Sequence, residues 1–320
     1  MIVTFTPNPS LDRTLSLEEP LSPGSVQRLS ETIDFAGGKG INVAHACALA
    51  GEDTLAVLPA RATDPFLMVM QETPIPFEAT PSSGTVRTNI TITDSAGETT
   101  KLNGPGPVLS PLDVDAALST LIEHAAEADY MVLAGSLPRG VDVDFYCTLA
   151  RTLHDAVPQL PLAIDTSDDP LRALAPQLES LQLDVLKPNG MELGQIVGVS
   201  GARLEASAHA GDYAPVAEAA SHLIARGLST CITTLGAAGA VLTTAEGSWV
   251  ARSEAITPVS TVGAGDCTLA GYAMARTRGD SPCHALKLAV SYGTAATLKP
   301  GTMIPSAADA AAIRVDVDKL

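Results

Sequence analysis

A glycine-rich segment followed by an aspartate has the composition of a phosphoryl-transfer site. Residues 261–266 read Thr-Val-Gly-Ala-Gly-Asp, and the run 267–276 that follows can form a helix. Glycines at the start of a helix leave backbone N–H groups directed at one spot, where the helix dipole also favours an anion. We expect Gly263, Ala264 and Gly265 to hold a transferring phosphoryl group there and Asp266 to accept a proton from the attacking hydroxyl. A tight turn followed by a helix-terminal acid explains the same residues.

A second glycine-rich segment, residues 37–42, reads Gly-Gly-Lys-Gly-Ile-Asn. It has phosphate-binding chemistry but fits neither GxxxxGK[ST] nor GxGxxG, which weakens the P-loop and Rossmann interpretations and disfavours a nicotinamide dehydrogenase. On a helix that begins near Gly38, Lys39 and Asn42 lie on one face and can meet one polar ligand. A glycine turn at Gly37 and Gly38 with an exposed lysine is the alternative.

Residues 187–192, Lys-Pro-Asn-Gly-Met-Glu, follow directly on a predicted buried strand. The Asn189 amide and the Glu192 carboxylate, three residues apart, can reach Mg²⁺ or its water ligands, because this ion prefers oxygen donors. An N-cap at Asn189 with Glu192 in the first helical turn is an equally good local explanation.

Two further segments follow predicted strands. Residues 234–239, from Thr234 through Gly236 to Gly239, admit a flat base or simply turn a hairpin. Asp12 lies just beyond the first strand, in the crevice where α/β sheets bind ligands, although a loop-capping role suits it equally. Cys267 has no suitably placed histidine partner, so we interpret it as a small buried side chain.

The elements that must position these residues alternate along the chain, which predicts an α/β fold with a mostly parallel sheet and helices on both faces. Short β-rich runs are expected to be buried strands; they are residues 2–5, 54–58, 130–134, 161–165, 183–186 and 230–234. Runs rich in Ala and Leu are expected to be helices; they are residues 40–50, 111–128, 142–157, 168–179 and 213–226. Residues 200–212 are expected to be a surface insertion.

Residues 85–93 interrupt this alternation with a two-sided pattern. Thr85, Arg87, Asn89 and the two following odd-numbered threonines share one face of an extended chain, and the even-numbered residues share the other. With 97–102 as its expected partner and 26–33 as a third candidate, this strand predicts a small inserted sheet. Its polar face is suited to cover a pocket.

Composition limits the classes of function. The 320 residues include 46% hydrophobic and 17% charged residues, and 36 acids against 19 bases give a formal charge of −17. Such a chain can bury a large core, but it repels nucleic acid and acidic membrane surfaces. No apolar run reaches the roughly 20 residues that span a bilayer, and no signal peptide is recognisable. Five widely spaced cysteines without a CxxC motif favour a reducing cytoplasm.

Taken in order, the motifs resemble the ribokinase-like sugar kinases of the PfkB family over almost the whole chain. Within the family the chain is most similar to the 1-phosphofructokinase branch, through TPNPSLDRT (6–14), GGKGINVA (37–44), VRTNI (86–90), NGPGP (103–107), AGSLPRGV (134–141) and STVGAGD (260–266). Plain ribokinases commonly have an aspartate two residues before the first glycine of the GAGD segment. This chain has Thr261 at that position, preceded by Ser260, which favours the phosphosugar branch. Cys267 departs from a frequent serine, and the segment 200–212 departs from the compact pattern.

The resemblance implies a three-layer sandwich over residues 1–320 with an inserted β lid formed by segments near 13–36 and 84–103, and a homodimer through that lid. It also implies ATP and Mg²⁺ as cofactors. Asn189 and Glu192 then organise the metal, while Lys187, Thr234, Gly236 and Gly239 face ATP.

The implied sugar site uses residues from several segments. Asp12 fixes sugar hydroxyls; Lys39, Arg87 and Arg28 bind the phosphate already present, with Arg139 a weaker candidate. Substrate contacts also come from residues of the second glycine-rich segment, namely Gly37, Gly38, Gly40 and Asn42.

The implied activity is phosphorylation of fructose 1-phosphate at its C6 hydroxyl by ATP. Tagatose 6-phosphate kinase and 6-phosphofructokinase share the motif set and stay open as alternatives. A sugar-phosphate sensor without catalysis is a further alternative, which the combination of Asp266, Asn189 and Glu192 disfavours, because a pure binding protein needs neither a base nor a metal organiser.

Overall fold

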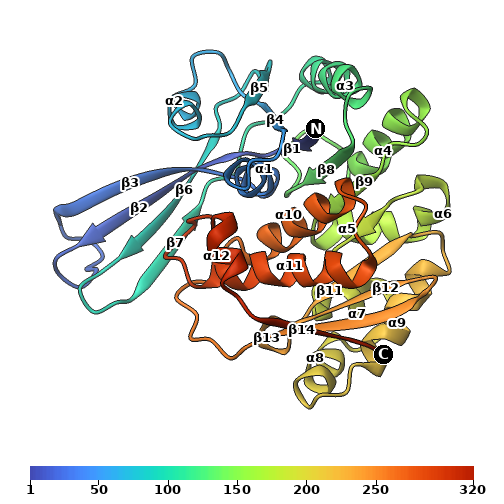
Figure 1. Ribbon diagram of the computed structural model, residues 1–320. Coiled ribbons are helices and arrows are strands. Elements are labelled where there is room, and N and C mark those ends of the chain that lie inside the picture. The colour runs from blue at the N-terminus through green and yellow to red at the C-terminus, as the bar shows by residue number, and fades with distance from the viewer.

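A ten-stranded sheet forms the centre of the computed structural model, which describes residues 1–320 (Figure 1). Its parallel part runs, in spatial order, through β5 (Phe77–Thr80), β4 (Thr54–Pro59), β1 (Ile2–Phe5), β8 (Tyr130–Ala134), β9 (Leu162–Asp165), β10 (Val185–Leu186) and β11 (Thr230–Thr234). Three antiparallel strands extend it, namely β12 (Ala240–Thr244), β13 (Gly247–Ser253) and β14 (Val315–Lys319). The predicted strands are confirmed, and the mostly parallel sheet with them.

Helices cover both faces of this sheet. One face carries α3 (Pro111–Ala125), α4 (Phe145–Ala156), α5 (Asp168–Leu174), η1 (Ala175–Gln177), α6 (Leu178–Leu181), α7 (Gly190–Val197), α8 (Gly201–His209) and α9 (Ala214–Ile224). The other face carries α1 (Lys39–Leu49), α10 (Ala264–Thr277), α11 (Pro282–Thr297) and α12 (Ala307–Ala311), and α2 (Phe66–Gln71) packs beside α1.

The alternation of side chains along β1 shows why the sheet has two apolar faces. Val3 and Phe5 are buried in the core formed with α3 and α4, whereas Ile2 is buried in the core formed with α10 and α11. Successive residues of a strand point to opposite faces, so a strand between two helical layers must be apolar throughout. The predicted three-layer sandwich is confirmed.

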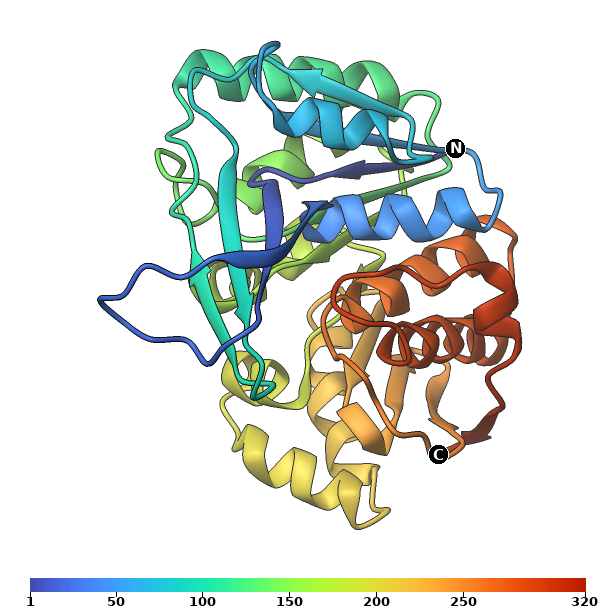
Figure 2. The same cartoon turned by 90° about the vertical axis from the view of Figure 1, so that its left-hand side faces the viewer.

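A separate four-stranded sheet projects from the main body and is called the lid below (Figures 1 and 2). Its strand order is β3 (Leu29–Gly37), β2 (Ser10–Leu17), β6 (Arg87–Thr93) and β7 (Thr99–Asn103). The predicted pairing of the 85–93 strand with the segment near 97–102 is confirmed, as is the strand near 26–33. The central strand β2 was not anticipated as a strand from its sequence, which mixes polar and apolar residues.

Two predictions need correction, one of a helix and one of a surface insertion. The expected helix over 168–179 is divided into α5, η1 and α6, with Pro176 inside the 3₁₀ turn, because a proline removes the N–H that a continuous helix requires. The expected surface insertion at 200–212 contains α8, whose Leu204 and Ala208 are buried in the main core. That segment is therefore part of the packed body and not only a surface addition.

None of the helices is both long enough and apolar enough to span a bilayer.

Candidate active site

The carboxyl ends of two parallel strands and the N-termini of two helices converge on one polar centre. Asp165 ends β9 and Lys187 follows β10, while Lys39 and Asn42 come from the start of α1 and Asp266 from the start of α10. Parallel strands bring their carboxyl ends to the same edge of a sheet, which is the usual ligand site of such folds. The structure thus brings together residues that lie more than 200 positions apart in sequence, such as Asn42 and Asp266.

Asp266 has the surroundings expected of a proton acceptor. Its side chain is buried, and Asn42 Nδ2 donates a hydrogen bond to its Oδ2 at 2.7 Å. Burial raises the pKa of the Asp266 carboxyl, and the negative charge of Asp165 acts in the same direction, whereas the ammonium groups of Lys39 and Lys187 oppose the rise. A carboxylate whose pKa is raised toward the working pH is a better base than a fully solvated one.

The glycines before Asp266 form the start of α10. Gly263 is the N-cap and adopts φ 76°, a left-handed conformation that favours glycine. A Cβ at Gly265 would lie 3.1 Å from Lys187 Nζ, so the lysine ammonium packs directly against the first helical turn. Backbone N–H groups, a helix dipole and an ammonium group therefore face the same spot, as an anion site requires.

Asp165 is a site residue that the sequence analysis did not identify. Its carboxylate is 3% exposed and lies between two ammonium groups, with Lys39 Nζ 3.2 Å from Oδ1 and Lys187 Nζ 3.3 Å from Oδ2. Burial opposes ionisation, but the two lysines prevail and hold the pKa of Asp165 below its ordinary value. Its position as the last residue of a buried parallel strand was the signal that could have revealed it.

Lys39, the residue that the family resemblance assigns to the sugar phosphate, has a protein partner in this structure. Its ammonium is bound to Asp165, which raises the lysine pKa. Its side chain is still 37% exposed, so it also faces the space beside Asp266. The charges of Asp266 and Glu192 also raise the pKa of Lys39, so this ammonium lies within reach of the field of both carboxylates.

Asp12 lies on the lid and belongs to a polar cluster. Ser10 Oγ and Asn89 Nδ2 donate hydrogen bonds to Asp12 Oδ1 at 2.8 and 2.9 Å. A Cβ at Gly37 would come within 2.2 Å of Asp12 Oδ2, so the absence of a side chain there makes room for the carboxylate. Asp12 is therefore held at the edge of the lid, next to the start of α1. A carboxylate in this position can accept hydrogen bonds from a polyhydroxylated ligand.

Arg87 is the cation of the lid that faces this cluster. Its Nε is buried without a hydrogen-bond partner, and Asn8 Oδ1 is buried without one as well. Gly106 lies against both residues, since a Cβ there would be 2.4 Å from Asn8 Oδ1 and 3.5 Å from Arg87 Cδ. Buried polar atoms are almost always paired, so two unpaired ones beside the same glycine indicate a site for a polar ligand.

The two other arginine candidates differ in their positions. Arg139 Nη2 donates a hydrogen bond to the Gly106 carbonyl at 2.9 Å and so ties its own loop to the loop beside Arg87. Arg28 is exposed in the connection between β2 and β3, the loop that protrudes at the left of Figure 2. No hydrogen bond or ion pair joins Arg28 to the other candidates, and the structure does not bring it into this site.

The proposed metal residues form a helix cap in this structure. Asn189 Oδ1 accepts from the Glu192 N–H at 2.8 Å, and Glu192 Oε2 accepts from the Asn189 N–H at 2.9 Å, which is a complete capping box at the start of α7. No group of three or more His, Cys, Asp or Glu side chains is arranged to hold a metal ion. A Mg²⁺ ion that keeps its waters and binds substrate phosphates needs only one or two protein carboxylates, and Glu192, whose charge acts on Lys39, fits that requirement.

The segment 234–239 turns a hairpin between β11 and β12. Thr234 ends β11 and forms a bridge with Asn189, and η2 (Gly236–Ala238) makes the turn. A Cβ at Gly239 would approach the Ala251 carbonyl to 2.0 Å, so this glycine is required by strand packing. A Cβ at Gly236 would meet no atom within 4 Å, which leaves the turn open beside Thr234.

Cys267 is fully buried behind Asp266, and burial raises the pKa of its thiol, so it has no nucleophilic character. This agrees with its interpretation as a packing residue.

Comparison with known proteins agrees with this geometry. A family model described as pfkB family carbohydrate kinase matches residues 9–309. The 1-phosphofructokinase of Haloferax volcanii is 33% identical over 97% of this chain and 95% of its own length. The ATP-dependent 6-phosphofructokinase isozyme 2 of Mycobacterium tuberculosis is 32% identical over 94% of this chain and 85% of its own length.

Solved structures show the same fold. Phosphofructokinase-2 from Escherichia coli, in a complex with potassium, superposes with a TM-score of 0.81 at 26% identity, covering 97% of this chain and 96% of that chain. Ribokinase from Thermotoga maritima has a TM-score of 0.72 at 20% identity, covering 98% of each chain, which supports the ribokinase-like architecture alone. With a family model spanning nearly the whole sequence, the chain belongs to the pfkB family of carbohydrate kinases.

Proposed function

We propose that this carbohydrate kinase transfers the γ-phosphoryl group of ATP to the C6 hydroxyl of fructose 1-phosphate, giving fructose 1,6-bisphosphate and ADP. The observation that supports the choice of a phosphorylated sugar is the partly buried Arg87 on the lid, whose guanidinium Nε is buried without a hydrogen-bond partner. Desolvation lowers the pKa of Arg87, which means that its charge lacks a full set of compensating partners. A phosphate dianion supplies them, because arginine binds phosphate through paired charge-assisted hydrogen bonds.

The residues divide the chemical work by position. Asp12, fixed by Ser10 and Asn89, accepts hydrogen bonds from sugar hydroxyls and so orients the ring. Asp266 removes the proton from the attacking hydroxyl, and Asn42 holds its carboxylate in place. The first turn of α10 stabilises the charge of the transferring group with N–H donors that need no rearrangement during the reaction.

ATP is proposed to lie along the carboxyl ends of β10 and β11, beside Lys187 and the open turn at Gly236. Mg²⁺ would neutralise charge on the ATP phosphates there. Glu192 is the carboxylate of this chain placed to hold the ion or its waters, and Lys187, whose Nζ packs against Gly265, directs its charge at the same phosphates. Asp165 keeps both active-site lysines in position.

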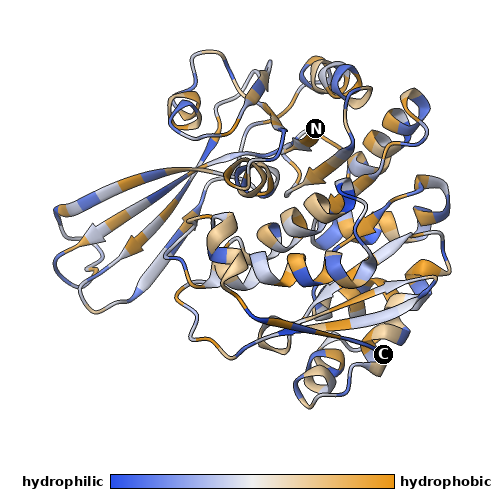
Figure 3. Cartoon of the chain, in the orientation of Figure 1, coloured by the Kyte–Doolittle hydropathy of each residue, from blue (hydrophilic) through white to orange (hydrophobic).

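The lid is also proposed to form a homodimer. The face opposite Asp12 carries apolar residues from three of its strands, and Figure 3 shows hydrophobic bands along this projecting sheet. These residues are Leu11, Leu15, Ile90, Ile92 and Leu102. A second lid packed on this face would remove apolar surface from water, which favours association.

A 6-phosphofructokinase is the second candidate, because the Mycobacterium relative with that name is nearly as similar as the 1-phosphofructokinases. An ADP-release assay with fructose 1-phosphate, fructose 6-phosphate, tagatose 6-phosphate and unphosphorylated fructose separates the possibilities. The proposal expects the highest kcat/KM with fructose 1-phosphate. A preference for fructose 6-phosphate would establish the second candidate, and no turnover with any sugar phosphate would favour a binding protein.

A further inference from the structure

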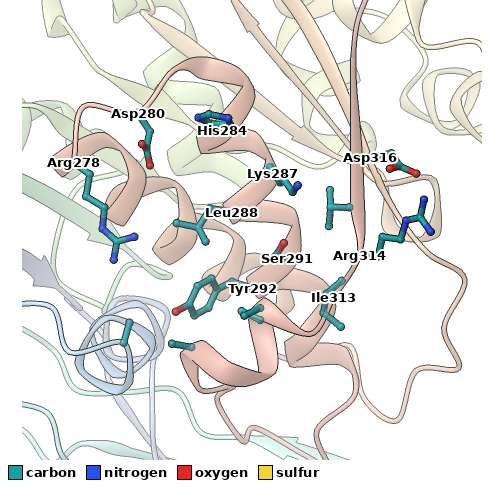
Figure 4. A pocket seen from close by; sticks show the side chains of 15 residues that line it. Arg278, Asp280, His284, Lys287, Leu288, Ser291, Tyr292, Ile313, Arg314 and Asp316 are labelled. Carbon is teal, nitrogen blue, oxygen red and sulfur yellow. The ribbon is translucent and has the colours of Figure 1, made fainter.

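Buried side-chain atoms without a hydrogen-bond partner are distributed unevenly over the molecule. None of them lines the hollow of about 620 Å³ between α11, α12 and the first residues of β14, where Figure 4 shows Arg314 and Asp316 directed away from α11. Three such atoms, on Asn8, Arg87 and Asn89, lie instead where the lid meets the main sheet. Because buried polar atoms are normally paired, this junction is where the fold is prepared for a polar ligand.

A loop after β7 forms the wall beside the Arg87 side chain. It consists of residues 104–107, Gly-Pro-Gly-Pro, and is called the GPGP loop below. A Cβ at Gly104 would be 3.4 Å from Arg87 Cβ, and one at Gly106 would be 3.5 Å from Arg87 Cδ. Both glycines therefore lie directly beside the aliphatic part of the arginine. Since that part carries the guanidinium group at its end, the place of this loop decides where the charge of Arg87 is presented.

The GPGP loop is held at two points. The Gly104 N–H donates a hydrogen bond to the Thr88 carbonyl at 3.1 Å, which attaches the start of the loop to β6. Farther along, the Gly106 carbonyl accepts a hydrogen bond of 2.9 Å from Arg139 Nη2. The two prolines of the loop have no N–H to donate, so the loop can do little to fix itself through its own backbone. Arg139 is the side chain that holds this part of the loop.

Arg139 lies on a segment that is itself fixed. Its carbonyl accepts a hydrogen bond from the Leu109 N–H at 2.9 Å. Asn8, which is 5% exposed and follows β1, donates from Nδ2 to Ser136 Oγ at 3.1 Å and to the Leu137 carbonyl at 3.3 Å. The Arg139 side chain therefore connects the GPGP loop to a segment that is anchored on the end of a central strand.

We propose that Arg139 is a positioning residue, which orients Arg87 toward the phosphate of the sugar substrate by holding the GPGP loop against it. The inference rests on the proposed function, in which Arg87 binds that phosphate. Without the hydrogen bond to Gly106, the loop and Arg87 can take other arrangements, and the apparent affinity falls with the fraction of molecules that keep the competent one. Arg139 acts only through Arg87, so it affects binding of the sugar phosphate and neither binding of ATP nor the transfer step.

Steady-state kinetics of the full-length protein with fructose 1-phosphate, and in parallel with fructose 6-phosphate, test this. We expect Arg139→Ala to raise the KM for the sugar phosphate about three- to tenfold, with kcat and the KM for ATP within about twofold of the wild type. Gly106→Ala, whose Cβ would meet Asn8 Oδ1 at 2.4 Å, displaces the same loop without removing a charge and should raise the same KM. Arg226→Ala, which removes an exposed arginine from the turn before β11, is the matched control and should behave like the wild type.

The double variant Arg87→Gln/Arg139→Ala separates positioning from direct contact. If Arg139 acts only through Arg87, the KM for the sugar phosphate is the same in the double variant as in Arg87→Gln. A further rise of about threefold or more would show that Arg139 contacts the substrate by itself and would overturn the proposal. A raised KM in Arg87→Gln beside an unchanged KM in Arg139→Ala overturns this inference alone, whereas an unchanged KM in Arg87→Gln overturns the proposed phosphate site and the inference with it.

Discussion

Replacement of Asp266 by asparagine should lower activity strongly without lowering stability. The side chain is buried, and Asn42 Nδ2 lies 2.7 Å from Oδ2, so an asparagine carbonyl can accept the same hydrogen bond and preserve the local shape. The amide cannot take a proton from the sugar hydroxyl. We therefore expect kcat to fall by about 10²–10⁴, which corresponds to roughly 3–5 kcal/mol of transition-state stabilisation.

The stability of the same variant follows from the pKa of Asp266. Because burial raises that pKa in the folded protein, the ionised carboxylate opposes folding at every pH above the folded value. This cost first appears as the pH rises above the unfolded pKa and is complete above the folded one. Asp266→Asn removes it, so the melting temperature near pH 7 should stay the same or rise by about 1–3 °C.

The alternative role for Asp266, a helix-terminal acid without catalytic function, gives opposite results. Loss of a favourable charge at the start of α10 would lower stability by less than about 1 kcal/mol and leave turnover near normal. Steady-state kinetics, thermal melts and calorimetric binding of fructose 1-phosphate distinguish the two roles. A variant that keeps more than about a tenth of the wild-type kcat would remove Asp266 from the role of base.

Three further substitutions test other parts of the site. Arg87→Gln should raise the KM for the sugar phosphate at least about tenfold and leave the KM for ATP unchanged. Arg28→Gln, which changes an exposed arginine of the same lid, should leave both KM values nearly unchanged. An equal rise in both KM values for Arg87→Gln would refute the assignment. Glu192→Gln should move the Mg²⁺ dependence of turnover to higher concentration, and an unchanged titration would leave only helix capping. Asp165→Asn leaves the Lys187 ammonium buried without a counter-ion and should lower the free energy of unfolding in urea by about 3–5 kcal/mol at pH 7. Because the pKa of Asp165 is lowered in the folded state, the carboxylate should stabilise the wild type at neutral pH and lose this effect as the pH falls through the folded pKa. A urea midpoint of Asp165→Asn equal to that of the wild type at pH 7 would contradict this.

The order of strands and helices could be read from the sequence because each element has its own local pattern. A strand between two helical layers must be apolar throughout, and the residues of β1, β8 and β9 satisfy this. The glycines before Asp266 and the alternating polarity of residues 85–93 are likewise local signals, and they predicted a helix start and a two-sided strand. The family resemblance added the expected activity, cofactors and lid.

Strand β2 was hidden from this kind of analysis. It forms the middle of the lid, between β3 and β6, yet its polar residues include Asp12 and Arg13. Asp12 is satisfied by Asn89 on a neighbouring strand, and Arg13 by Asp34 on the other neighbour at 2.7 and 2.6 Å. Only the pairing of strands supplies these partners, so propensity along β2 alone could not reveal it.

The amino-acid sequence shows which chemical groups the chain carries and which elements hold them. Their partners depend on the folded arrangement, in which Asp165 lies between Lys39 and Lys187 and Arg28 is exposed on the lid. Lys39 and Asp165 are 126 residues apart, and only the parallel sheet brings their segments to one edge. A charge in a protein interior takes its properties from neighbours contributed by distant segments, and the order of residues along a chain does not contain those distances.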